Sequence, residues 1–202
     1  MNKCSKKLIS MVNTVKYDRE QVIQKATHLF WAKGFHATSM RNIQECIDMH
    51  PGSIYACFGS KEGLFKETLN YYTNAMLKRL ESFEEAQSSP LLALKKFIFT
   101  SALDSNQIRP NEMCMLVKTI SELNTDNKEL LEEARRLMKV MENAFARLLN
   151  QAKQEGELET QQDANRLARF LQMQLIGVRS YSRVNNQAEI KDLIEDAFSC
   201  LN

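Results

Sequence analysis

The chain has 202 residues, of which 44% are hydrophobic and 26% charged, a composition typical of a globular protein with one large domain or two smaller ones. It holds only six glycines and three prolines, so turn-forming residues are scarce and long helices are favoured over a many-stranded sheet. No apolar run approaches the length of a membrane-spanning helix, and we therefore expect a cytoplasmic protein with no membrane segment.

The net charge of +2 is unevenly distributed along the chain. Residues 1–61 carry nine Lys and Arg against four Asp and Glu, whereas residues 62–202 carry eighteen against twenty-one. A basic first part joined to an acidic remainder suits a protein with one face turned toward a polyanion. The five cysteines form no Cys-x-x-Cys pair, and the three histidines have no metal-ligand spacing to them. We therefore expect a reduced cytosolic protein with no metal and no cofactor.

The first helical pattern follows a basic arm. Residues 1–17 are interpreted as this flexible arm and not as a signal peptide. Asp18 and Gln21 form a capping box for a helix that is predicted to end near Lys33. Gly34 is its natural C-terminal stop.

Two short helices joined by a tight turn come next. Thr38 is predicted to cap the first, which carries apolar residues spaced three and four apart. Asp48 must take the left-handed conformation of the turn. His50 precedes the second helix, and Pro51 begins it, because the fixed φ of proline suits a first helical position. This second helix is predicted over residues 51–57, and the pair is what a helix-turn-helix needs to enter a DNA major groove.

Longer helices separated by turn residues fill the rest of the chain. Their predicted ranges are 61–87, 91–103, 112–123, 126–154, 163–183 and 187–201, with a loop over 104–111. No strand is predicted. The expected fold class is all-α.

The residues from Asp18 to Phe65 resemble the TetR/AcrR family of bacterial transcriptional regulators. The stretches that carry the resemblance are, in order, Phe30-Trp-Ala-Lys-Gly-Phe, Ala37-Thr-Ser-Met-Arg-Asn-Ile, Gly52-Ser-Ile-Tyr and Phe58-Gly-Ser-Lys-Glu-Gly-Leu-Phe. The resemblance implies a three-helix helix-turn-helix DNA-binding domain over 18–61 and a helical ligand-binding and dimerisation domain over 62–202. It also implies a homodimer.

The family's DNA contacts carry over onto matching positions of this sequence. They are Thr38, Ser39, Arg41, Pro51, Gly52, Ser53, Tyr55 and Lys61. The physics agrees, because helix N-termini bind anions and phosphate contacts fix the register of a protein on DNA. Asp48 and His50 stand where the family usually has Gly and Ser or Thr, so the base preference does not transfer.

The part of the chain after residue 62 contains six of the ten methionines. A flexible lining of Met and Phe suits an adaptable apolar pocket for a small-molecule inducer, and core packing is the alternative. The candidate pocket residues are Met76, Phe97, Met113, Met115, Met141, Phe145, Phe170 and Met173.

The last two predicted helices carry continuous apolar stripes. The stripes comprise Ala164, Leu167, Leu171, Leu175 and Val178, and Ile190, Leu193, Ile194, Ala197 and Phe198. The resemblance implies that these helices form a four-helix dimer interface.

Cys114 is a candidate sensor thiol. It is predicted at a helix start, where the helix dipole lowers the pKa of a thiol. Its surroundings also resemble a branch of the family, some of whose members sense electrophiles or oxidants through cysteine. A small buried hydrophobe is the alternative, and Glu112 beside it opposes thiolate formation. Cys57, on the predicted groove helix, is a second candidate.

Together these patterns predict a non-enzymatic transcriptional regulator, a repressor released from a palindromic operator by an inducer bound in its C-terminal domain. A repressor that senses oxidants or electrophiles through Cys114 is the alternative. A phosphate-binding loop at Gly59-Ser60-Lys61 is disfavoured, because Ser precedes Lys and no strand is predicted before it. A helical enzyme or interaction module without a DNA role is the competing class.

Overall fold

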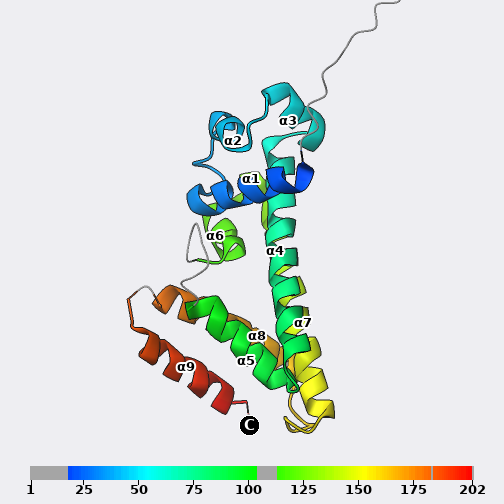
Figure 1. Ribbon diagram of the computed structural model, residues 1–202, viewed down its shortest axis with the longest axis vertical. Helices are drawn as coiled ribbons and strands as arrows, with labels where there is room; N and C mark the ends of the chain where they lie inside the picture. Colours follow the sequence, from blue (N-terminus) through cyan, green and yellow to red (C-terminus); the bar gives the residue numbers. More distant parts are fainter. Residues whose placement is uncertain (1–17, 104–112, 183, 202) are drawn as a thin grey trace, which may run out of the picture.

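The computed structural model describes residues 18–103, 113–182 and 184–201, and within these ranges it contains helices and no strand (Figure 1). The helices are α1 (Arg19–Lys33), α2 (Met40–Ile47), α3 (Pro51–Phe58), α4 (Lys61–Ala86), α5 (Pro90–Leu103), α6 (Met115–Glu122), α7 (Lys128–Gln154), α8 (Ala164–Tyr181) and α9 (Gln187–Ser199), with a 3₁₀ turn η1 (Thr125–Asn127) before α7. The all-α prediction is confirmed.

The long helix α4 connects the two ends of the molecule. Helices α1, α2 and α3 lie around its first turns, and α5, α8 and α9 lie toward its other end (Figure 1). The short helix α6 lies between α1 and the α5–α8 layer. No helix among the described residues is long and apolar enough to cross a membrane.

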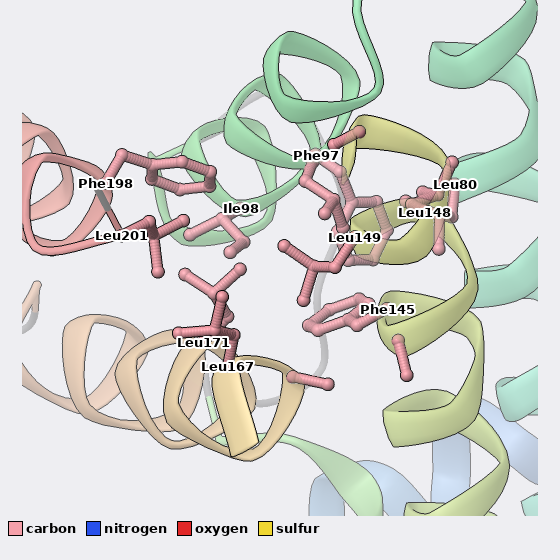
Figure 2. Close-up of a cluster of buried hydrophobic side chains, with 14 of the residues drawn as sticks. Leu80, Phe97, Ile98, Phe145, Leu148, Leu149, Leu167, Leu171, Phe198 and Leu201 are labelled. Atoms are coloured by element: carbon pink, nitrogen blue, oxygen red, sulfur yellow. The ribbon is translucent and has the colours of Figure 1, made fainter. Parts of the chain in front are cut away.

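Two hydrophobic clusters hold this arrangement together. The head cluster contains Val22, Ala26, Phe30, Trp31, Phe35, Ile43, Ile47, Met49, Ile54, Phe58, Leu64, Phe65, Leu69, Tyr72, Met115, Leu116, Leu123, Leu130, Ala134 and Leu137. The body cluster is built from α5, the second half of α7, α8, α9 and Leu80 of α4, and Figure 2 shows its side chains converging from these helices. Met76 packs against both clusters. The head cluster also includes Met115 and Leu116 of α6 and Leu130, Ala134 and Leu137 of α7. Helix α6 and the start of α7 therefore pack with α1, α2 and α3 in the core of this end of the molecule, which we call the head.

The predicted apolar stripes of α8 and α9 face the interior of the single chain. All of their residues except Leu193 are buried or half-buried, and nearly all pack in the body cluster. Burying one Leu or Phe side chain stabilises a fold by about 1.5–3 kcal/mol. The apolar surface of these stripes is already buried within one chain, so it contributes to the stability of that chain. These stripes are therefore not the surface of a dimer interface. The expectation that the two helices form such an interface stays a prediction, and the interface would use their outer faces.

Most predicted helix ends are confirmed. Asp18 caps α1, its Oδ1 accepting the backbone N–H of Glu20 and Gln21. Asp48 has φ 54° and ψ 49°, and among the described residues it is the only non-glycine with positive φ. Helix α3 begins at Pro51 and continues to Phe58, with His50 as an N-cap residue that makes no side-chain cap bond.

Several boundaries differ from the prediction. Thr38 does not cap α2, because Ser39 does: its Oγ accepts the Asn42 N–H at 3.2 Å, and Asn42 Oδ1 accepts the Ser39 N–H at 3.1 Å. Helix α6 spans Met115–Glu122 where 112–123 was predicted. Helix α7 begins at Lys128 where 126 was predicted, α8 ends at Tyr181 where 183 was predicted, and α9 ends at Ser199 where 201 was predicted. The basic arm, the loop over 104–111 and the predicted helix residues 112 and 183 lie outside the described residues.

Candidate functional site

The first half of α3 presents an exposed face. Pro51 and Gly52 are exposed, Ser53 is half-buried, and Tyr55 is 50% exposed, while Ile54 points into the head cluster. A Cβ atom added at Gly52 would meet nothing within 4 Å. The absent side chain therefore serves no internal packing, and it leaves the backbone open to an approaching surface.

At the start of α2, two of the three predicted contact residues lie at the surface. Ser39 and Arg41 are exposed, and Arg41 Nε donates to Glu45 Oε1 at 2.8 Å. Thr38 is fully buried, and its Oγ1 donates to the Gly34 carbonyl at 2.6 Å. The prediction that the Thr38 side chain faces DNA is wrong, because its hydroxyl is used inside the fold.

Lys61 begins α4 and lies against the head. Its Nζ is 4.2 Å from the centroid of the Phe35 ring, and burial lowers the pKa of its ammonium group. Ser60 caps the helix through the Gly63 N–H at 3.0 Å. A Cβ at Gly63 would lie 2.0 Å from the Phe58 carbonyl oxygen, so the turn from α3 into α4 requires glycine there. The tight turn fixes Lys61 beside α3.

An inner cavity lies where the head cluster meets the body cluster. The space open to the centres of water molecules is about 40 Å³, room for about three waters. Its lining comes from α4 to α8 and consists of Tyr72, Met76, Phe97, Ser101, Cys114, Leu116, Met138, Met141, Phe145, Gln172, Leu175, Ile176 and Arg179. The lining is therefore mainly apolar, with a few polar groups, as in small-molecule sites.

Four of the predicted pocket residues do not line this cavity. Met115 is buried in the head cluster, and Phe170 packs on the outside of the body cluster. Met173 is 63% exposed on the outer face of α8. Met113 offers its backbone carbonyl to the Trp31 Nε1–H at 2.7 Å. The other four, which do line the cavity, are Met76, Phe97, Met141 and Phe145.

The polar groups of the cavity were not predicted. Arg179 Nη1 donates to Tyr72 Oη at 3.3 Å, and Gln172 Nε2 donates to the Met138 carbonyl at 3.0 Å. Burial raises the pKa of Tyr72, whose hydroxyl therefore stays protonated. One signal was available in the sequence: Arg179 lies four and eight positions after Leu175 and Leu171, on the same apolar stripe.

Cys114 is part of the cavity wall. It is the N-cap residue of α6, and Tyr72 Oη donates to its Sγ at 3.5 Å. Cys57, the second candidate thiol, is exposed on α3. No group of three or more potential metal ligands occurs among the described residues.

Helix α6 holds the end of α1 through polar contacts that we call the α6 clamp, made by Lys118 and Glu122. Lys118 Nζ donates to the carbonyls of Trp31 and Ala32 at 2.9 and 2.7 Å, in the last turn of α1. The Glu122 carboxylate accepts the backbone N–H of Phe35 at 3.0 Å and of His36 at 2.6 Å.

Gly34 makes the Glu122 contact possible. It has φ 88°, and a Cβ there would lie 2.3 Å from Glu122 Oε2. The helix that begins at the cavity thus ends in direct contact with the segment between α1 and α2.

Comparison with known proteins agrees with this architecture. Residues 22–68 match the family described as "Bacterial regulatory proteins, tetR family", and residues 96–198 match the "Tetracyclin repressor-like, C-terminal domain". The chain is 25% identical over 169 residues to the HTH-type transcriptional repressor ComR of Escherichia coli (strain K12), covering 83% of this chain and 80% of that protein. It is 26% identical over 196 residues to the uncharacterized HTH-type transcriptional regulator YezE of Bacillus subtilis (strain 168), covering 93% and 97%.

Among solved structures, one similar fold is the TetR family transcriptional regulator CifR, a cysteine mutant complexed with 26-bp double-strand operator DNA. The TM-score is 0.81 at 20% identity, and the match covers 93% of this chain and 98% of that one.

Proposed function

Because the chain belongs to the tetR family of bacterial regulatory proteins and is a DNA-binding transcriptional regulator, we propose that it is a repressor released from its operator by a small molecule bound in the inner cavity. Regulators of this family are not enzymes. The observation that carries the proposal is α6, which begins at the cavity with Cys114 and Leu116 and ends in the clamp on the head.

Residues 18–61, with their helix-turn-helix, form the proposed DNA-binding domain, and residues 62–202 form the ligand-binding and dimerisation domain. Within the former, α3 would enter the major groove, with Pro51, Gly52 and Ser53 closest to the bases. Tyr55 is the exposed hydroxyl on this face and would donate to a phosphate. Ser39 and Arg41 at the start of α2 would contact the backbone on one side of α3, and Lys61 on the other. Arg41 would exchange its Glu45 partner for phosphate.

A homodimer would place two α3 helices in successive major grooves of a palindromic site, about 34 Å apart. Exposed apolar residues on the outer faces of α8 and α9 support a dimer there. Met173, Tyr181 and Leu193 are 63%, 56% and 41% exposed. A Cβ at Gly177, between the first two, would meet nothing within 4 Å, so α8 is open to close approach by a partner helix.

Release follows if the ligand prefers a conformation in which the two heads no longer match the operator. Filling the cavity displaces side chains at the start of α6, and the clamp passes this displacement to the end of α1. A ligand weakens DNA binding only by its differential affinity for the two conformations.

Operator binding by the Tyr55→Ala/Lys61→Ala protein tests the DNA-binding part. Measured by fluorescence anisotropy across a salt series, affinity should fall for every sequence, and removing Lys61 should flatten the log–log salt slope by about one phosphate contact. Lys78→Ala is the matched control, because Lys78 is exposed on the same helix and about 25 Å further along it. Equal effects of the Lys61 and Lys78 substitutions would contradict the assigned face.

A second candidate keeps the DNA-binding function but replaces the ligand with oxidation or alkylation of Cys114. The position of the thiol in the cavity wall, next to the Tyr72 hydroxyl, favours it. Cys114→Ser protein should then keep its operator on treatment with peroxide or N-ethylmaleimide, while Cys57→Ser and Cys200→Ser proteins release it. Release by the Cys114→Ser protein would exclude this mechanism.

A further inference from the structure

The outward face of α3 has its smallest residues at its centre. Ile54 and Phe58 are buried in the head cluster and define the inward face of the helix. Two positions turn a helix by about 200°, so Gly52 and Ala56, each two positions before one of these residues, lie on the opposite face. Both are exposed. The surface that α3 turns most directly outward is therefore helix backbone and the single methyl group of Ala56.

Helix α3 has no side chain of the kinds that make bidentate contacts with bases. Residues 51–58 contain no Arg, Lys, Asn or Gln, the readers of guanine and adenine, and no Asp or Glu, which accept from cytosine. The hydroxyl of Ser53 can bond to several bases and so discriminates weakly between them. Tyr55 is assigned to a phosphate, and Cys57 has only a weak thiol donor. Apolar contact with the 5-methyl group of thymine is the direct readout that this face can make.

The two cations assigned to DNA lie outside α3. Arg41 belongs to α2, and Lys61 begins α4. Their proposed partners are phosphates, and such contacts fix the register of the protein without reading the sequence. A face without long side chains also lets the helix approach the base edges closely. A Cβ added at Gly52 would meet nothing within 4 Å, so the space there is open to a base.

We propose that α3 reads its half-site through the 5-methyl groups of thymine, which pack against Ala56 and against the backbone at Gly52. These two residues determine the specificity, and the preferred half-site presents thymine and not guanine opposite them. This inference deepens the DNA-binding function proposed above and rests on the docking of α3 in the major groove.

Selection from three random duplex pools by the full-length protein tests the readout before any operator is known. The first pool contains thymine, the second contains uracil in its place, and the third contains uracil together with 5-methylcytosine in place of cytosine. Thymine should be enriched at the positions that α3 reads in the first pool, and this preference should be lost in the second. Cytosine should be enriched at the same positions in the third pool, because the methyl group has moved from one pyrimidine to the other.

The consensus duplex from the first pool gives the magnitude. Remade with uracil at one such position in both half-sites, it should bind about fifteenfold more weakly in fluorescence anisotropy, or about fourfold for each methyl group removed.

Ala56→Arg should change the enriched base at the position opposite residue 56 from thymine to guanine, because Arg makes a bidentate contact with the O6 and N7 atoms of guanine. Ala86→Arg is the matched control, since Ala86 is an exposed alanine in the last turn of α4, at the other end of that helix from α3 (Figure 1). It adds the same charge and should leave the enriched sequence unchanged.

The comparison of the three pools uses the unmodified protein and does not depend on any variant folding. Equal enrichment of one sequence from the thymine and uracil pools would overturn the proposal and leave the DNA-binding function standing, since DNA shape would then carry the specificity. An unchanged half-site in the Ala56→Arg protein would also overturn it. Enrichment of no sequence from any pool would contradict the DNA-binding function and this inference with it.

Discussion

Asp48, at the turn of the helix-turn-helix, is a residue in a conformation that its side chain disfavours. The left-handed conformation costs most L-residues roughly 1–2 kcal/mol. The cost is smaller for Asp, and glycine has no comparable cost. The sequence predicted this conformation because the strain is local to the turn. The choice of Ser39 over Thr38 as N-cap could not be predicted, because both residues cap well and only the tertiary fold buries Thr38 against Gly34.

Asp48→Gly should therefore stabilise the protein by about 0.5–1 kcal/mol, since glycine relieves the strain but gives the unfolded chain more freedom. The free energy of unfolding from urea titration measures this. Asp48→Ala should destabilise the protein, because alanine keeps the strain and loses the polar side chain that tolerates it. An alanine protein as stable as the glycine protein would show that backbone strain is not the cause.

Helix α6 is the element that joins cavity and head, and its role was hidden in the sequence. Lys118 and Glu122 lie four positions apart and look like an ordinary surface pair. Only the packing of α6 under α1 turns them toward backbone groups at the end of another helix. The pocket was predictable in its composition, but helical spacing does not tell which cluster an apolar residue joins, as Met115 and Met173 show.

Glu122→Ala should expose the amide groups of Phe35 and His36 to exchange. Their acceptor is lost, and because the Phe35 N–H is part-buried, solvent can replace that acceptor only in part, which costs about 1–2 kcal/mol. Hydrogen exchange at these two amides should speed up by about tenfold or more. Ser121→Ala, on the neighbouring exposed residue, should leave their rates unchanged, and equal rates in both variants would contradict the clamp.

Helices α4 and α7 are linked by a bidentate pair whose contribution depends on pH. Arg147 Nη1 and Nη2 donate to the two Glu84 oxygens at 2.7 and 2.6 Å, and this holds the pKa of Glu84 below its usual value. A lowered pKa in the folded state means stabilisation that is complete above the unfolded pKa of about 4.3 and is lost as the pH falls further.

Glu84→Gln should lower the free energy of unfolding by about 0.5–1 kcal/mol at pH 7, the range for a partly exposed ion pair of good geometry. The difference from the unmodified protein should shrink when the pH is lowered below about 4. A double-mutant cycle with Arg147→Gln isolates the pair. If the difference in the free energy of unfolding between the unmodified and Glu84→Gln proteins stays constant from pH 7 to pH 3.5, the charge of Glu84 is not the source of that difference.

At the scale of the whole molecule, the fold class and the order of the helices were predictable from periodicity and capping alone. The surface on which two copies would meet was not predictable, because an apolar stripe looks the same in the sequence whether it packs against its own chain or against a second copy. The stripes of α8 and α9 pack in the body cluster, and the outer residues Met173, Tyr181 and Leu193 stay exposed.

Met173→Glu should shift the protein from dimer to monomer in sedimentation equilibrium, because a charge placed in an apolar interface is costly to desolvate. Leu92→Glu is the control, since Leu92 is a similarly exposed apolar residue on α5. A monomeric Met173→Glu protein should also bind a palindromic site far more weakly. If the Leu92 substitution dissociates the dimer and the Met173 substitution does not, the interface lies elsewhere.

Selection of bound DNA from a random pool tests whether this protein docks on DNA as a dimer through its two α3 helices. A dimeric repressor with one α3 in each of two successive major grooves predicts an enriched inverted repeat, with half-sites about one helical turn apart. The Tyr55→Ala/Lys61→Ala protein should fail to enrich it. Recovery of no sequence above the starting pool, or of an asymmetric site that the double variant binds equally well, would contradict the account.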